Sequence, residues 1–149
     1  MPEKNMEKYE IYKKMHEDLK KAITYEFYYE AIFIEYAIFE DRLNSLMKYG
    51  NVKYLDKYGN PIGINRKINR ARSNPTFTTD FVRKRITLEM LDQIESWKDR
   101  RNKLIHALAT TKYDEQSVKQ IALEGYDLVK VFSNKVQSVN NHNKKLLDK

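Results

Sequence analysis

The segment 101–106, which reads Arg-Asn-Lys-Leu-Ile-His, combines side chains that can cleave a phosphodiester bond of RNA. Such cleavage without a metal needs a base for the 2′-OH proton, an acid for the leaving 5′-oxygen and a cation for the transition state. Histidine suits the first two roles, and arginine suits the third because its guanidinium binds phosphate oxygens and stays charged. Arg101 and His106 are therefore candidate catalytic residues, and Asn102 could support them. The alternative is a chance pair, with Arg101 an ordinary helical residue and His106 a structural or surface one.

Arg101 occupies an unusual place on the helix that this segment predicts. At about 100° per residue, the apolar side chains of residues 86–109 fall within one arc of roughly 140°, and Arg101 lies near its centre. Asn102 and His106 are one turn apart and share the edge of that arc. An unpaired charge in a core costs several kcal/mol, so Arg101 needs an acidic partner, a water-filled cleft or an anionic ligand.

The segment 25–48 is the element expected to supply that partner. Its apolar side chains point nearly all round the helix, which predicts the central helix of a bundle or a helix that also packs on a second subunit. Glu35 sits opposite the other acids of the segment, among apolar residues, and is the first candidate partner for Arg101. The equal alternative is an ion pair with another basic residue, such as Arg42. Further ion-pair candidates are Glu40, Asp41 and Asp99.

The remaining sequence predicts helices joined by short connections. Only four Gly and three Pro occur in 149 residues, which favours long elements. Residues 3–49 predict one helix or two, with Thr24 as a kink or cap. The other expected elements are an irregular segment at about 50–63, a basic helix at 64–72, a helix from Thr79 or Asp80 to about 111 with a break near Thr87, and a last helix from Asp114 to about 145 with close packing at Gly125. We expect one all-α domain over residues 1–149, an antiparallel bundle of four to five helices.

The chain carries a formal net charge of +7 and contains no cysteine. The charge suits a polyanionic partner such as RNA, and the candidate RNA-binding residues are Lys98, Arg100, Lys103, Arg66, Lys67 and Arg70. The run 83–85 is another basic group, and a solvated face is the alternative for each group. No signal peptide or membrane span is visible, so we expect a cytoplasmic protein without membrane partners.

Histidine is scarce, and this bears on how a site could be assembled. His106 has only Asp99 and Asn102 as local companions, so we expect no metal site, and no cofactor is predicted. One histidine cannot easily serve as acid and base in the same turnover. Neither His16 nor His142 lies in a comparable setting. A symmetric homodimer would bring two copies of Arg101 and His106 into one cleft.

Four residues of this region, Trp97, Arg101, Asn102 and His106, also carry a family resemblance. Their arrangement, Trp-x3-Arg-Asn-x3-His, resembles the Arg-x4-6-His signature of HEPN domains (higher eukaryotes and prokaryotes nucleotide-binding). The Leu-Ile pair before the histidine and the position on the penultimate long helix match as well. An aromatic, acidic helix with Phe-Glu-Asp-Arg-Leu at 39–43 precedes it. The resemblance covers residues from about 25 to 136.

The resemblance implies an up-and-down helical bundle that dimerises with its motifs facing. Many HEPN proteins are metal-independent endoribonucleases of toxin–antitoxin, abortive-infection and phage-defence systems. By that likeness Arg101 and His106 carry catalysis, Asn102 supports them, and RNA and an antitoxin protein are partners. Other members are inactive, so the alternative is a helical module that binds nucleotide, RNA or a protein. One toxin subgroup has a modified tyrosine two residues after the histidine, where this chain has Leu108.

Overall fold

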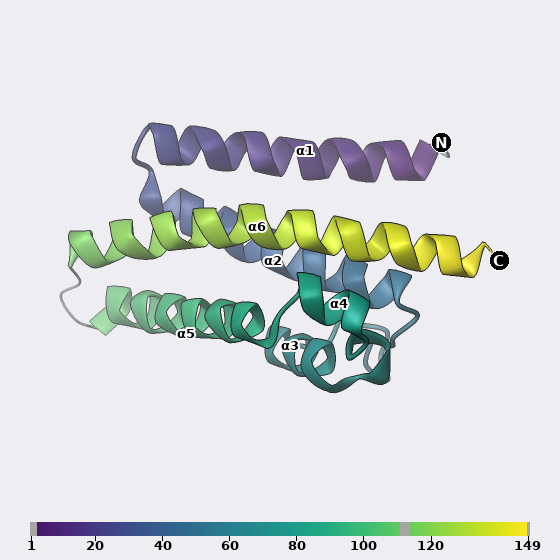
Figure 1. Ribbon diagram of the computed structural model, residues 1–149. Coiled ribbons are helices and arrows are strands. Elements are labelled where there is room, and N and C mark those ends of the chain that lie inside the picture. Colours follow the sequence, from purple (N-terminus) through teal and green to yellow (C-terminus); the bar gives the residue numbers. More distant parts are fainter. Residues whose placement is uncertain (1–2, 111–113, 149) are drawn as a thin grey trace.

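The computed structural model describes residues 3–110 and 114–148, and these residues form six α-helices and one short 3-10 helix (Figure 1). The helices are α1 (Glu3–Thr24), α2 (Tyr28–Tyr49), α3 (Ile64–Ser73), α4 (Asp80–Arg85), α5 (Leu88–Thr110) and α6 (Glu115–Leu147), with η1 at Pro75–Phe77. The predicted all-α class is confirmed. The predicted number of four to five helices is too low, because two of the expected helices are each divided.

The first division separates α1 from α2. The Thr24 hydroxyl donates to the carbonyl of Lys20 at 2.8 Å, and Glu26 adopts a φ of 62°. That left-handed backbone conformation is uncommon for residues other than glycine and is incompatible with a continuing helix. The sequence predicted one helix or two for residues 3–49, and the structure forms two consecutive helices.

The second division lies at Thr87, where the sequence predicts a break. The Thr87 hydroxyl oxygen accepts a hydrogen bond from the Met90 amide at 3.1 Å, which caps α5. Thr79 caps α4 in the same way, and the Asp114 carboxylate caps α6 by accepting from the Gln116 amide at 3.0 Å. The predicted caps are thus confirmed, and α5 ends at the last described residue before the gap.

The helix α2 is the central element of the bundle. It packs against α1, α3 and α6, and consecutive long helices run in opposite directions (Figure 1). Its Phe39 ring lies 5.0 Å from the Trp97 ring of α5 and 6.1 Å from the Phe132 ring of α6, so one aromatic cluster joins three helices. The prediction that segment 25–48 is central is confirmed. Of the helices described, none is long and apolar enough to span a membrane.

Close packing at Gly125, expected from its position inside a helix, is also confirmed. A methyl group at this position would overlap the carboxyl group of Glu35 and would lie 2.6 Å from the indole nitrogen of Trp97. Glycine therefore lets α6 approach both α2 and α5 closely. This contact fixes the depth at which Glu35 and Trp97 sit in the core.

Candidate functional site

Arg101 extends from α5 toward α2, where its guanidinium lies over an aromatic ring. The guanidinium carbon is 4.1 Å from the centre of the Tyr36 ring, a cation–π contact. Its Nη1 donates to the Oδ1 of Asn102 at 3.0 Å, and its buried Nε has no hydrogen-bond partner. Tyr36 was not identified from the sequence as a contact of Arg101. Its position one turn before Glu40 on α2 is the feature of the sequence that could have indicated it.

None of the four acidic candidates pairs with Arg101. Among the described residues, Glu40 pairs with Lys67 at 3.4 Å, Asp41 with Arg42 at 2.7 Å, and Asp99 with Lys98 at 2.7 Å. No ion pair to Arg101 occurs in the described part of the chain. Its positive charge is therefore stabilised by the Tyr36 ring and remains available to an anion.

The predicted pairing of Glu35 with Arg101 is wrong, and so is the alternative pairing with Arg42. Glu35 is 0% exposed, and neither of its carboxyl oxygens has a hydrogen-bond partner. It lies against Gly125 of α6, while the nearby Trp97 indole donates to the carbonyl of Ile121 instead. Burial first, and then the negative charge of Asp127, raises the pKa of Glu35 to about 10, so this carboxyl is neutral at pH 7.

Tyr36 belongs to a chain of polar contacts that crosses three helices. Its hydroxyl hydrogen-bonds Glu40, whose carboxylate in turn meets the fully buried ammonium of Lys67 on α3. Burial, followed by the Glu40 charge, raises the pKa of Tyr36, while Arg101 acts in the opposite direction. The phenol therefore stays protonated and donates to Glu40. The chain Lys67–Glu40–Tyr36 holds the ring on which Arg101 rests.

Asn102 and His106 lie beside Arg101 but are placed differently. The Oδ1 of Asn102 is occupied by Arg101, which leaves its amide NH2 able to donate to a ligand. His106 is exposed, and its imidazole makes no hydrogen bond within residues 3–110 and 114–148. At about 100° per residue, Arg101 and His106 diverge by about 140° around α5. A single chain therefore does not enclose both side chains in one pocket.

An apolar surface continues from Arg101 toward the C-terminal end of α5. Ile105 and Leu108, one and two turns after Arg101, are 42% and 43% exposed. Phe33, one turn before Tyr36 on α2, is 70% exposed. Because Arg101 lies on Tyr36, these three side chains extend the same stripe on both helices. Large exposed apolar groups next to an uncompensated cation are typical of a contact surface.

Several basic residues expected to bind RNA hold the fold together instead. Lys67 and Lys98 are buried, the latter contacting Asn65 as well as Asp99, so neither can face a ligand. Arg100 pairs with Glu124 at 2.5 Å, and Arg70 donates to the carbonyl of Lys53. Arg66 and Lys103 are exposed and make no ion pair within the described chain. The predicted RNA contact is therefore wrong for Lys67 and Lys98.

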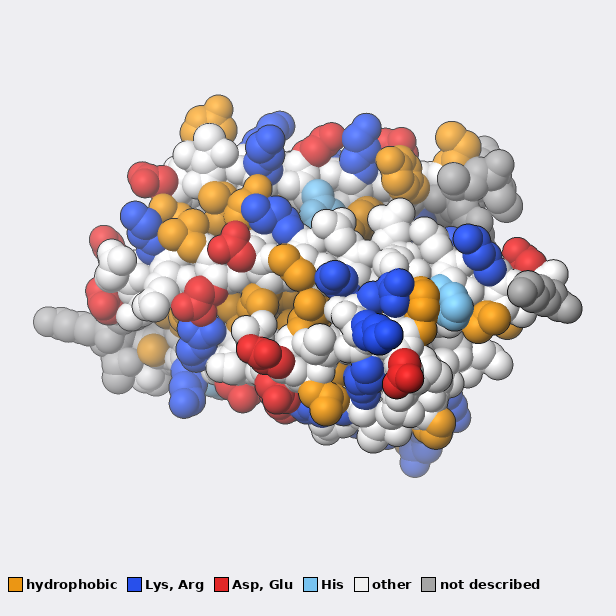
Figure 2. All heavy atoms as spheres, viewed as in Figure 1, with side chains coloured by type: hydrophobic (Ala, Val, Ile, Leu, Met, Phe, Trp, Pro, Cys, Tyr) orange, Lys and Arg blue, Asp and Glu red, His pale blue; other side chains and the backbone are white. Residues whose placement is uncertain are grey.

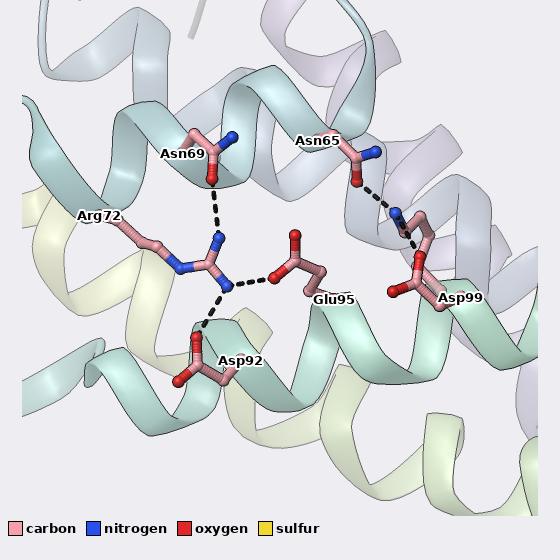
Figure 3. Close-up of polar contacts among 7 residues, drawn as sticks. Asn65, Asn69, Arg72, Asp92, Glu95 and Asp99 are labelled. Carbon is pink, nitrogen blue, oxygen red and sulfur yellow. Dashed lines mark hydrogen bonds and ion pairs between the residues drawn. The ribbon is translucent and has the colours of Figure 1, made fainter.

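Lys98 belongs to a seam of polar contacts between α3 and α5 (Figure 3). Arg72 of α3 reaches Asp92 at 2.7 Å and Glu95 at 2.5 Å, both on α5. Asn69 accepts from the same guanidinium at 2.8 Å, and Lys98 joins Asn65 one turn away. The seam fixes α5 against α3 and so sets the direction from which Arg101 approaches α2.

Comparison with known proteins adds no relative: no family model, curated protein or solved structure matches this chain. Within the described residues, no group of three or more His, Asp or Glu is placed to hold a metal ion. The resemblance to HEPN domains therefore depends on the motif residues alone.

Proposed function

We propose that this protein is a metal-independent endoribonuclease of HEPN type whose site forms between two copies of the chain. One observation carries the proposal. The Arg101 guanidinium is half-buried on the Tyr36 ring, and no carboxylate pairs with it in the described chain. Because no carboxylate of the described residues neutralises this guanidinium, it can still bind a phosphate group.

Each motif residue has a role in such a reaction. Arg101 binds the non-bridging phosphate oxygens, and the free amide NH2 of Asn102 donates to one of them. One His106 takes the 2′-OH proton while the 2′-oxygen attacks phosphorus. The bond from phosphorus to the 5′-oxygen then breaks, and that oxygen receives a proton from the second His106. The products are a 2′,3′-cyclic phosphate and a 5′-hydroxyl end.

The geometry of a single chain favours a homodimer. Arg101 and His106 point to different sides of α5, and one chain supplies one such histidine. A twofold axis beside α5 would place the Arg101 of one copy near the His106 of the other. Phe33, Ile105 and Leu108 supply apolar surface for this contact. Their burial would also exclude water from the reacting groups.

The biological setting follows from the resemblance to HEPN toxins and defence effectors. We propose that the enzyme acts on RNA in the cytoplasm as a toxin or phage-defence effector. An antitoxin protein would then hold it inactive until it is needed. Growth arrest on expression, abolished by changing Arg101 or His106, is the expected phenotype.

The experiment is RNA cleavage in excess EDTA, with the product ends identified chemically. The wild type should leave 2′,3′-cyclic phosphate ends, and His106→Ala should abolish cutting while circular dichroism shows an intact fold. Ser96→Ala, an exposed change on the same helix, is the matched control and should cut normally. Unchanged cutting by His106→Ala would rule out this mechanism.

A non-catalytic helical module is the second candidate, and one observation favours it. The imidazole of His106 has no hydrogen-bond partner in the described residues, so no hydrogen bond from them orients it. Such a module would bind nucleotide, RNA or a protein through Arg101. It would cut no RNA, yet its binding would saturate and weaken with salt. Harmless expression of the wild type would favour this function.

A further inference from the structure

We propose that a second surface, where α4 packs on the C-terminal half of α6, anchors single-stranded RNA away from the cleavage site. This α4–α6 platform consists of Phe81, Lys84, Arg85, Lys135, His142 and Lys145. The proposal rests on the proposed function only in taking RNA as the ligand. The motif at Arg101 contributes nothing to the platform.

The centre of the platform is a stack of three side chains. The His142 ring lies 3.7 Å from the Phe81 ring, centre to centre, with an interplanar angle of 19°. The guanidinium carbon of Arg85 is 3.5 Å from the centre of the same Phe81 ring. Since the imidazole covers one face of Phe81, Arg85 covers the other. The stack is thus arranged as Arg85, Phe81 and His142.

Hydrogen bonds fix the arginine of this stack. Arg85 Nη1 donates to the Phe81 carbonyl at 2.9 Å, and Nε donates to the Ser138 hydroxyl of α6 at 3.1 Å. Its Nη2 makes no hydrogen bond in the described chain and can donate to a phosphate. The platform therefore presents a rigid cation beside a stacked ring, and binding would cost little side-chain entropy.

Lysines surround the stack on both helices. Lys135, Ser138, His142 and Lys145 are spaced three or four residues apart, so they share the side of α6 that faces α4. Lys84 precedes Arg85 on α4 and is exposed. Figure 2 shows Lys and Arg side chains gathered over α4 and the adjoining part of α6, with a histidine and a hydrophobic side chain among them.

Little negative charge opposes these cations. Asp80 is the acid of α4, and Asp148 follows α6, but no ion pair joins either of them to the platform lysines. The acids of this face gather instead between α5 and α6, in a groove lined by Glu89, Asp92, Glu124 and Asp127. Three of these acids are ion-paired, to Arg72, Arg100 and Lys130, and none of these pairs involves a residue of the platform.

This combination of groups fits a single strand better than a duplex. Cations contact phosphates regardless of sequence, whereas an aromatic ring can stack only on a base that is not already paired and stacked. His142 is only partly buried, so part of its ring remains open to a base. A-form duplexes present phosphates and sugars, while their bases stay stacked inside.

The platform lies far from the proposed site of cutting. It adjoins the start of α5, and at 1.5 Å per residue about 27 Å of helix separates Leu88 from His106. A stacked strand advances about 3.4 Å per nucleotide, so roughly eight nucleotides are needed to reach from one to the other. The platform therefore acts as an anchor for substrate and takes no part in the chemistry.

The first test measures binding of a fluorescent 20-nucleotide oligouridylate RNA by the folded His106→Ala protein at several salt concentrations. Adding K84Q, K135Q and K145Q should weaken binding at least tenfold. The plot of log K against log[salt] should also become less steep by about two, because each lost phosphate contact removes roughly 0.7 from its slope. The control triple K13Q, K20Q and K21Q makes the same charge change on α1 and should alter binding less than twofold. Equal loss in both triples, or no detectable RNA binding by the His106→Ala protein, would overturn the platform.

The second test separates stacking from charge. His142→Ala should weaken binding about fivefold or more, and His142→Phe should restore it because the ring is kept. Equal weakening by both substitutions, or a duplex RNA that binds as tightly as the single strand, would contradict a stacking platform. Loss of binding to phosphatidylserine vesicles in the K84Q triple, with RNA binding unchanged, would assign the surface to a membrane. A wild type that binds RNA through the platform but never cuts would refute the ribonuclease and leave the platform standing.

Discussion

The guanidinium carbon of Arg101 lies 4.1 Å above the ring of Tyr36, and that ring is held in turn by the hydrogen bond from its hydroxyl to Glu40. The relationship gives Arg101 a fixed direction without neutralising it. An acidic partner would have fixed the side chain equally well but would have consumed its charge. Tyr36 is therefore a positioning residue for the cation that the proposed ribonuclease mechanism requires.

Replacing Tyr36 tests this role. Tyr36→Leu removes the ring and should lower kcat/KM for RNA cleavage roughly 3- to 30-fold, the equivalent of a cation–π contact of about 0.5–2 kcal/mol. Tyr36→Phe keeps the ring and should retain most of the activity. A Tyr36→Phe enzyme as slow as Tyr36→Leu would show that the hydroxyl, and not the ring, matters to Arg101.

The buried carboxyl of Glu35 should make stability depend on pH. Its pKa is raised to about 10 in the folded protein, against an ordinary 4.5 in the unfolded chain. The stabilisation from the protonated form is therefore complete below pH 4.5 and is lost as pH rises toward 10, by about 1.4 kcal/mol per unit. Urea unfolding between pH 5 and 9 should show this decline in the wild type relative to Glu35→Gln, which cannot ionise. Parallel pH curves for the two proteins would mean that Glu35 is ionised in the folded state.

Gly125 should be intolerant of even one added carbon. Gly125→Ala gains about 1 kcal/mol in helix propensity, yet its methyl would overlap the Glu35 carboxyl and the Trp97 indole. Overpacking of this kind costs about 1–3 kcal/mol, so we expect a net loss in the free energy of unfolding. Asn134→Ala, an exposed change on the same helix, should have little effect. A gain in stability for Gly125→Ala would show that α6 can move away from α2 without penalty.

The apolar surface beside Arg101 should determine the oligomeric state. Phe33→Asp places a charge at the most exposed of its three apolar side chains and should convert a dimer to a monomer in solution mass measurements, with loss of RNA cleavage. Leu123→Asp adds the same charge at another exposed apolar position, on α6, and should leave a dimer. A monomeric wild type that cuts RNA would remove the need for a second subunit.

The sequence predicted the elements better than their contacts. Caps at Thr79 and Asp114 and close packing at Gly125 follow from local backbone chemistry, which short-range patterns encode. The partner of Arg101 depends on which of two neighbouring residues, Glu35 or Tyr36, turns toward α5. Adjacent residues differ by about 100° around a helix, and the close approach of α6 to α2 at Gly125 buries Glu35 rather than Tyr36.

The basic residues illustrate the same limit. Lys67 and Lys98 look like members of a solvated or RNA-facing group in the sequence, but Lys67 is buried against Glu40 of α2 and Lys98 is buried at the α3–α5 seam. Each burial depends on a contact between helices, made by residues that lie more than 20 positions apart in the sequence. The stack of Arg85, Phe81 and His142 likewise joins α4 to α6, a contact between distant segments that the spacing within either one does not reveal.

The most direct measurement is the rate of RNA cleavage in EDTA by the wild type, Arg101→Ala and His106→Ala, with mass spectrometry of the product ends. A composite HEPN-type site predicts 2′,3′-cyclic phosphate ends from the wild type and loss of cutting in both folded variants. Absence of cutting by the wild type, or equal cutting by all three proteins, would contradict it.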